Sequence, residues 1–143
     1  MRRGGGIRSW WLAARMAGWV AVLPAALRML PVARVARLVE PANRASRVHD
    51  RDPERLVALS QRVTALLSRR PEQRCLVRSL VLYRFLLRAG LAPELQVGFE
   101  RTEAGVRGHA WVCVDGVAVT DSQARLATLT PAMTFAAAAS RGR

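Results

Sequence analysis

The chain is 143 residues long, with 51% hydrophobic and 23% charged residues, and its formal net charge is +13. These values predict one domain with a modest core and exclude disorder throughout the chain. All 23 basic residues are arginine, spread from Arg2 to Arg143 without clustering beside aromatic residues. The charge therefore indicates an acidic peptide or an acidic partner protein more than a nucleic acid.

The cysteine content points to a reducing compartment. Two cysteines, Cys75 and Cys113, give no disulfide framework, which fits a cytoplasmic protein. The chain contains no Cys-x-x-Cys pair and no histidine-rich stretch. We therefore expect neither a metal nor a cofactor.

The N-terminal part predicts helices. Ser9 can cap a helix over residues 10–23, which Pro24 would break or restart, and a short helix follows over residues 31–40. The uncharged run 16–27 has 12 residues, fewer than the roughly 20 of a membrane span. A signal peptide is an alternative, because arginines precede this apolar run. The interleaved tryptophans and arginines favour a helix lying on the protein's own core or on a membrane interface, and we do not expect membrane association.

A connector and an amphipathic helix come next. Residues 42–51 form the connector, and His49 within it is interpreted as a solvated loop histidine. Asp52 then caps a helix that has Pro53 in its first position. The apolar residues of this helix recur at intervals of three and four, which predicts a stripe facing the core: Leu56, Leu59, Val63, Leu66 and Leu67. We place the N-terminal helical segment at residues 1–50 and the core at residues 51–143, together one compact unit.

Residues 74–90 predict the central helix, with Pro71 before it and Gly90 at its end. Its inward face carries Cys75 in the first turn, where backbone N–H groups and the helix dipole favour a thiolate and can hold an oxyanion. The opposite side is also apolar at Val77, Val81 and Phe85. We therefore expect the sheet to cover the cysteine's face and the N-terminal helices to cover part of the other.

After Gly90 the pattern becomes alternating, which is typical of strands. We predict strands over residues 94–101, 106–114 and 117–121, joined as an antiparallel meander of at least three strands. Residues 132–139 receive no assignment. The predicted class is α+β, with a cysteine-bearing helix packed on a small antiparallel sheet, as in a transglutaminase-like or papain-like core.

The order of three residues indicates the chemistry. An isolated inward cysteine such as Cys75 is more often a small core residue than a nucleophile. Here, however, His109 near the start of one strand and Asp121 at the end of the next complete the order of a Cys-His-Asp hydrolase. We expect His109 to deprotonate Cys75 and Asp121 to orient the imidazole. The Cys75 N–H and a second donor, Gln73, would hold the oxyanion.

The hairpin register decides whether the histidine and the acid meet. A two-residue loop, Asp115-Gly116, would pair Ala110 with Asp121. A three-residue loop with a bulge at Gly116 would instead pair His109 with Asp121. Because only the second register builds the triad in this way, we expect the bulge.

Three other residues near these positions have predicted roles. Trp111 is expected to line the substrate cleft or to cover the histidine–aspartate pair, and Ser79 is a second candidate for the cleft. Cys113 shares a strand face with His109 but lies about 13 Å along the strand, which makes it a poor nucleophile for that base.

A family resemblance rests on four stretches in this order: Cys75-Leu76-Val77-Arg78-Ser79-Leu80, Leu86-Leu87-Arg88-Ala89-Gly90, Val97-Gly98 and His109-Ala110-Trp111-Val112. Together they resemble the stand-alone leader peptidases of lasso-peptide biosynthesis, over roughly residues 56–121. The resemblance implies a transglutaminase-like cysteine protease that removes the leader from a ribosomally made precursor peptide. It also implies a separate leader-recognition protein and a downstream ATP-dependent cyclase as partners.

Two other functions compete with this interpretation. One is a different transglutaminase-like activity, either amide hydrolysis or acyl transfer to an amine, because water and amines attack the same thioester. The other is a basic, Trp- and Arg-rich module that binds a membrane or nucleic acid around an inactive core. Replacement of Cys75 separates the two classes, since a binding module would keep its function.

Overall fold

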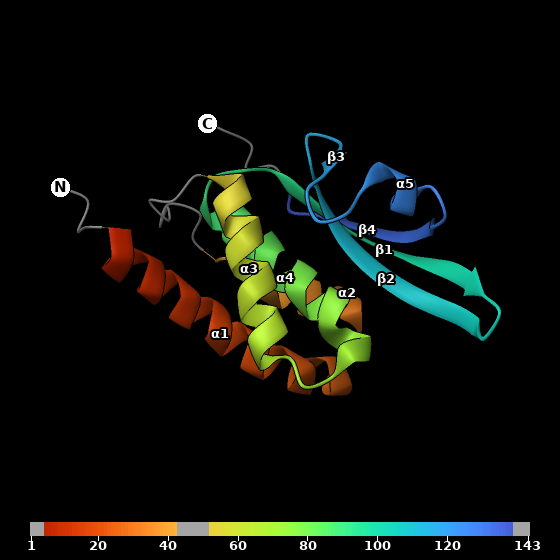
Figure 1. The fold of residues 1–143 in the computed structure, drawn as a ribbon, viewed down its shortest axis with the longest axis horizontal. Coiled ribbons are helices and arrows are strands. Elements are labelled where there is room, and N and C mark those ends of the chain that lie inside the picture. The colour runs from red at the N-terminus through yellow and green to blue at the C-terminus, as the bar shows by residue number, and fades with distance from the viewer. Residues whose placement is uncertain (1–4, 43–51, 139–143) are drawn as a thin grey trace.

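The computed structural model describes residues 5–42 and 52–138 of the chain. Its helices and strands follow in this order: α1 (Gly5–Met29), α2 (Val32–Val39), α3 (Pro53–Leu67), the 3₁₀ helix η1 (Pro71–Gln73), α4 (Arg74–Arg88), β1 (Pro93–Thr102), β2 (Gly105–Val114), β3 (Val117–Ala118), α5 (Gln123–Leu126) and β4 (Thr130–Ala136). The long helices gather on one side and the strands on the other (Figure 1), so the predicted α+β class is confirmed. His49 and most of the predicted connector lie outside the described residues.

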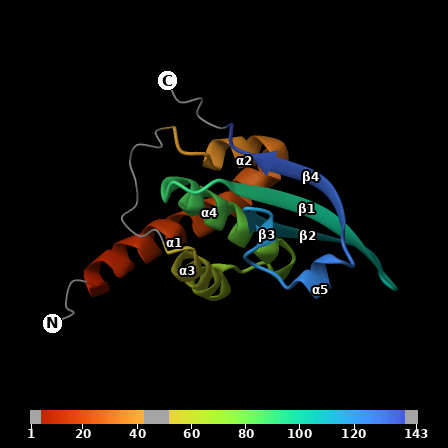
Figure 2. The ribbon, with the colours of Figure 1, turned by 90° about the horizontal axis from the view of Figure 1, so that it is seen from above.

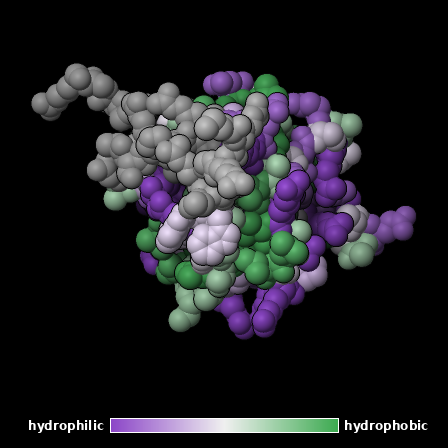
Figure 3. All heavy atoms as spheres, turned by 60° about the vertical axis from the view of Figure 1, so that its left-hand side comes forward, coloured by the Kyte–Doolittle hydropathy of each residue, from purple (hydrophilic) through white to green (hydrophobic). Residues whose placement is uncertain are grey.

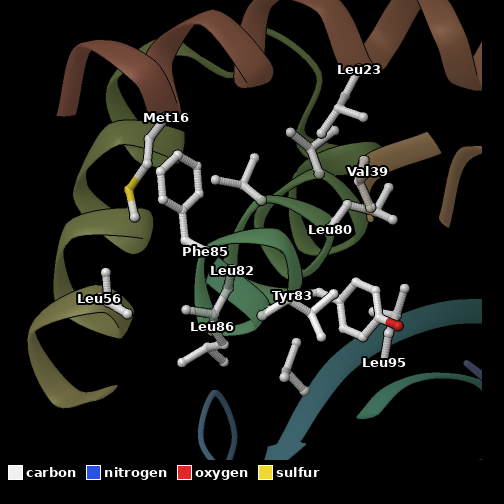
Figure 4. Packing of buried hydrophobic residues seen from close by; sticks show 14 of the residues in the cluster. Met16, Leu23, Val39, Leu56, Leu80, Leu82, Tyr83, Phe85, Leu86 and Leu95 are labelled. Atoms are coloured by element: carbon white, nitrogen blue, oxygen red, sulfur yellow. The ribbon is translucent and has the colours of Figure 1, made fainter. Parts of the chain in front are cut away.

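The core is built around α4, which packs against α1, α2 and α3 on one side and against β1 and β2 on the other. Figure 2 shows α4 between α1 and the strands. Side chains from every neighbouring layer meet those of α4 in Figure 4: Met16, Leu23, Val39, Leu56 and Leu95 surround Leu80, Leu82, Tyr83, Phe85 and Leu86. The expectation that this helix is covered on both sides is confirmed.

α1 differs from the predicted helix at both of its proposed limits. It begins at Gly5, before Ser9, and it continues through Pro24 to Met29. Proline removes one backbone N–H from the hydrogen-bond ladder and usually kinks or ends a helix. Burial of Val20 and Leu23 in the core beside Pro24 offsets that loss.

The outer side of α1 is apolar as well. Trp10, Trp11 and Met29 are 64%, 62% and 82% exposed. In length and composition, the 21 residues Ser9–Met29 could cross a membrane, and this stretch lies near the N-terminus. On the face that Figure 3 shows, hydrophobic residues gather in one area bordered by hydrophilic ones.

Two polar residues of α4 fasten the N-terminal helices. The Arg84 guanidinium lies over the Trp19 ring of α1, 4.4 Å from its centroid, and donates to the Val39 carbonyl of α2 at 2.7 Å. The Tyr83 hydroxyl donates to Glu40 at 3.1 Å. Burial, and then the neighbouring arginines of α1 and α4, lower the pKa of Arg84. The cation–π contact and the carbonyl offset part of that desolvation.

α3 begins as predicted but faces the core differently. The Asp52 carboxylate accepts from the backbone N–H groups of Glu54 and Arg55 at 3.1 and 3.5 Å. Leu66 and Leu67, however, do not reach the core, and Leu66 is 83% exposed. The buried face is instead Leu56, Ser60, Val63 and Thr64. The predicted stripe was wrong in its last turn, because the small polar residues Ser60 and Thr64 occupy the buried face in place of Leu66 and Leu67.

The sheet has four strands in the order β3-β2-β1-β4. The predicted meander is its first three strands, although β3 is only Val117–Ala118. β4 and α5 were not expected, because Pro131 and two alanines interrupt the sequence of β4 (TPAMTFA), and proline is tolerated only at a sheet edge.

Gly98 allows β4 to approach the sheet. A Cβ at this position would lie 2.6 Å from the Thr130 carbonyl oxygen and 2.9 Å from the Trp111 ring. The β1–β4 register also shifts between Val97 and Gly98. A glycine here therefore lets Trp111 and β4 pack on the same strand.

Candidate active site

Cys75 is the second residue of α4 and is partly buried. η1 leads directly into this helix, so the thiol lies where the chain turns into its central element. It lines a cleft of about 900 Å³. The opposite walls come from β1, β2, β4, α5 and the segment after β3. The lining residues are Val32, Pro71, Glu72, Arg74, Cys75, Leu76, Arg78, Val97, Phe99, Val106, Arg107, Gly108, His109, Ala110, Asp121, Arg125 and Met133.

His109 and Asp121 form a close pair in this cleft. His109 Nε2 lies 3.1 Å from Asp121 Oδ1, and both side chains are only 9% exposed. With Nε2 facing the carboxylate, Nδ1 is the ring nitrogen left to act as a base toward a thiol. The structure thus brings Cys75, His109 and Asp121 to one cleft.

The predicted hairpin register was wrong, yet the pair forms. Cys113 pairs with Ala118 and Val114 with Val117, which leaves the two-residue loop Asp115-Gly116. Both loop residues have positive φ, 51° and 77°, as a type I′ turn requires. We did not expect this two-residue loop, because a continued ladder would set Asp121 opposite Ala110.

The chain leaves the ladder before that can happen. Val119 N–H still donates to the Val112 carbonyl at 2.9 Å, and the Thr120 hydroxyl accepts from the Val112 N–H at 3.2 Å. The chain bends over residues 119–121, and this bend carries Asp121 to the histidine. The acid is therefore positioned by a chain bend that a threonine side chain holds in place, and no bulge is needed.

Two arginines that sequence reasoning did not assign surround the acid. Arg78 Nη2 of α4 lies 3.6 Å from Asp121 Oδ2, and Arg125 Nε of α5 lies 3.8 Å from Oδ1. Their spacing was the available signal: Arg78 is one turn after Cys75, and Arg125 is four residues after Asp121. Arg78 therefore joins the helix that carries the thiol to the acid that orients the histidine.

This contact predicts a positioning role for Arg78. Arg78→Leu is expected to lower kcat on the order of tenfold with KM nearly unchanged, because the acid loses its tie to α4 and small displacements of reacting groups are costly. Arg78→Lys should retain more activity, since it keeps the charge. Steady-state kinetics measure the effect. The control is Arg62→Leu, because Arg62 is an exposed residue of α3. A wild-type kcat for Arg78→Leu would rule the role out.

Trp111 and Ser79 do not line the cleft. Trp111 is buried and stacks on His109, with ring centroids 6.1 Å apart and planes 19° apart. Of its two expected positions, it therefore has the one that covers the histidine. Ser79 is fully buried and donates to the Ala110 carbonyl at 3.0 Å, which fastens α4 to the strand of His109. Its expected place in the cleft was wrong, because the inward face of α4 meets the sheet there.

Gln73 and Cys113 also lie apart from the cleft. Gln73 is not among the residues that line the cleft and lines a separate hollow beside α1. Cys113 is on the same strand face as His109 but farther along β2, where it is buried against Trp111 and Leu129. Burial, and then the Glu94 carboxylate, raise the pKa of the Cys113 thiol. Within residues 5–42 and 52–138, no cluster of three or more His, Cys, Asp or Glu side chains could hold a metal ion.

Comparison with known proteins decides the family. The model of the transglutaminase-like superfamily matches residues 17–134, which is most of the chain. The chain belongs to the transglutaminase-like superfamily. No curated protein and no solved structure matches it. Membership in this superfamily supports cysteine protease or acyl-transfer chemistry, and the match extends from within α1 to β4.

Proposed function

We propose that this transglutaminase-like protein is a cysteine peptidase that removes the leader from a lasso-peptide precursor. The observation that carries the proposal is the shared cleft: Cys75 at the start of α4 opens to the same space as the 3.1 Å His109–Asp121 pair. Superfamily membership supports the chemistry, and the resemblance of the cysteine and histidine stretches to leader peptidases supports the substrate.

The proposed reaction uses these three side chains in two stages. His109 Nδ1 takes the proton of Cys75, and Sγ attacks the carbonyl carbon of the last leader residue. The imidazolium, stabilised by Asp121, returns the proton to the leaving amine as the C–N bond breaks, which releases the core peptide. Water then attacks the thioester and gives a proton to His109. The C–S bond breaks, the leader leaves as a carboxylic acid, and the thiol is restored.

One oxyanion donor is available from the backbone. The Cys75 N–H belongs to the first turn of α4, where N–H groups point away from the helix toward an incoming anion. Gln73, the expected second donor, lines the separate hollow beside α1 and is not among the residues that line the cleft.

The proposal includes partners and a compartment. The peptidase would act in the cytoplasm on a precursor presented by a separate leader-recognition protein, ahead of an ATP-dependent cyclase that closes the ring. A chain of 143 residues leaves little surface for a sequence-specific leader groove beside its catalytic core. A separate recognition protein would supply that surface.

Incubation of the precursor peptide with the enzyme, with and without the recognition protein, tests this function. We expect cleavage at one leader–core bond, at least about tenfold faster with the recognition protein because it raises the local concentration of substrate. Mass spectrometry of the products reports the bond. Equal rates at saturating precursor would contradict the role of the partner. An amide product formed only when an amine is added would indicate acyl transfer instead of hydrolysis.

A further inference from the structure

The cleft around the catalytic residues has an excess of positive charge. Its lining includes four arginines and two acidic residues, Glu72 and Asp121. Asp121 already faces His109, Arg78 and Arg125, within 3.1 to 3.8 Å. The Asp121 carboxylate therefore contacts three basic groups. The cleft contains more basic side chains than its own carboxylates can neutralise.

Three of these arginines reach solvent from three different elements. Arg74 precedes Cys75 on α4, and Arg107 shares a strand face with His109 on β2; both are exposed. Arg125 on α5 has a side chain that is 52% exposed. We call these three residues the basic rim. All three line the cleft that Cys75, His109 and Asp121 also line.

The contacts of the rim with the rest of the protein are weak. Arg74 donates to the Ser68 carbonyl at 3.5 Å, the limit of a hydrogen bond, and Arg125 is 3.8 Å from Asp121. Arg107 is opposite Glu100 on β1, and Glu100 does not line the cleft. Arg84, by contrast, donates to the Val39 carbonyl at 2.7 Å.

Beside the basic rim lies an exposed apolar wall. Phe99, Val106 and Met133 are 44%, 70% and 39% exposed and line the same cleft. Phe99 and Val106 belong to β1 and β2, whose hairpin extends past the helices at the right of Figure 1, and Met133 belongs to β4. The cleft therefore offers guanidinium groups and apolar surface together.

We propose that the basic rim binds acidic side chains of the substrate peptide close to the scissile bond, while the apolar wall receives a neighbouring hydrophobic residue. Guanidinium groups pair with carboxylates through two parallel hydrogen bonds, stronger than neutral ones. The substrate class is then an extended peptide with Asp or Glu beside a hydrophobic residue. This inference rests on the proposed peptidase function for its role in turnover, but peptide binding tests it separately.

Binding to the Cys75→Ala protein measures the preference without turnover. Two pools of fluorescein-labelled ten-residue peptides share one hydrophobic residue and differ only in having Asp and Glu or Asn and Gln at the same positions. We expect the acidic pool to bind about five- to tenfold more tightly by fluorescence anisotropy, and less so as salt rises. Equal affinity of the two pools would overturn the proposal.

Charge reversal separates a local site from the general field of a protein with a net charge of +13. Arg107→Glu, made in the Cys75→Ala protein, is compared with Arg62→Glu, which changes the net charge equally on the exposed side of α3. We expect Arg107→Glu to remove most of the preference and Arg62→Glu to keep it. Equal loss in both would mean that only overall charge attracts the peptide, and would overturn the site. Circular dichroism verifies that both variants fold.

Cleavage of the same pools by the wild-type enzyme tests the two proposals separately. Faster cleavage of the acidic pool through a lower KM supports the basic rim. Cleavage of both pools at one rate would overturn the rim and leave the peptidase function intact. If neither pool nor the precursor is cleaved but the acidic pool still binds more tightly, the peptidase function fails and the carboxylate site stands.

Discussion

Cys75→Ala is expected to abolish cleavage, with a loss on the order of 10⁵-fold or more in kcat, because no other group in the cleft can form the thioester. The side chain lies in the first turn of α4 and lines the same cleft as the His109–Asp121 pair. Alanine has high helix propensity and fits this position, so the fold should not change. The measurement is precursor cleavage followed by mass spectrometry, with thermal unfolding as the check on folding.

Cys113→Ser is the matched control for this variant. Cys113 is buried farther along β2 against Trp111 and Leu129 and does not line the cleft, and burial, followed by Glu94, raises the pKa of its thiol. Because the thiolate is the reactive form, this cysteine should alkylate slowly at neutral pH and faster only as the pH rises toward that raised pKa. Limiting iodoacetamide at neutral pH should therefore modify Cys75 first and inactivate the enzyme. Inactivation with modification at Cys113 alone would contradict the assignment.

The helices of the core were predictable where local chemistry determines their ends. The Asp52 cap and Pro53 start α3, and Pro71 and Gly90 enclose the central helix, as their side chains and backbone preferences indicate. α1 was not predictable in the same way, because Pro24 signals a break. Its continuity depends on burial of residues such as Leu23, and that contact is made with other elements of the fold.

The sheet, in contrast to the helices, could be predicted only in part from the sequence. The first strands have clear alternation, but β4 has an Ala- and Pro-containing sequence and is stabilised by pairing with β1. The residue that permits this pairing, Gly98, could be noticed in the sequence, yet only the close approach of Thr130 and Trp111 explains it. The division of the chain at residues 50 and 51 stays a prediction.

The candidate site was predictable as a set of residues but not as a geometry. Chain order pointed to Cys75, His109 and Asp121, which the structure brings to one cleft. The expected bulge was wrong, because register arguments assume that a strand continues, whereas this chain bends over residues 119–121. Arg78 was seen only as a motif residue, since its contact with Asp121 depends on how α4 meets that bend.

Asp121→Asn is expected to keep the fold and to lower kcat/KM by about 10³- to 10⁴-fold. The amide oxygen can still accept from His109, but it cannot stabilise the imidazolium that forms during each proton transfer. In this protein the loss has a second cause. Arg78 and Arg125 lie 3.6 and 3.8 Å from the carboxylate, and without its charge both would face the imidazolium as unpaired cations.

A double-mutant cycle separates these two causes. Arg78→Gln is made alone and with Asp121→Asn, and kcat/KM is measured for all four proteins. If the uncompensated cation contributes, the second change should restore part of the activity lost in Asp121→Asn, although Arg78→Gln alone lowers activity. If the losses of the two single variants are strictly additive, the whole effect of Asp121→Asn comes from the lost stabilisation of the imidazolium. Activity of Asp121→Asn within about threefold of wild type would show that this carboxylate does not orient the catalytic histidine.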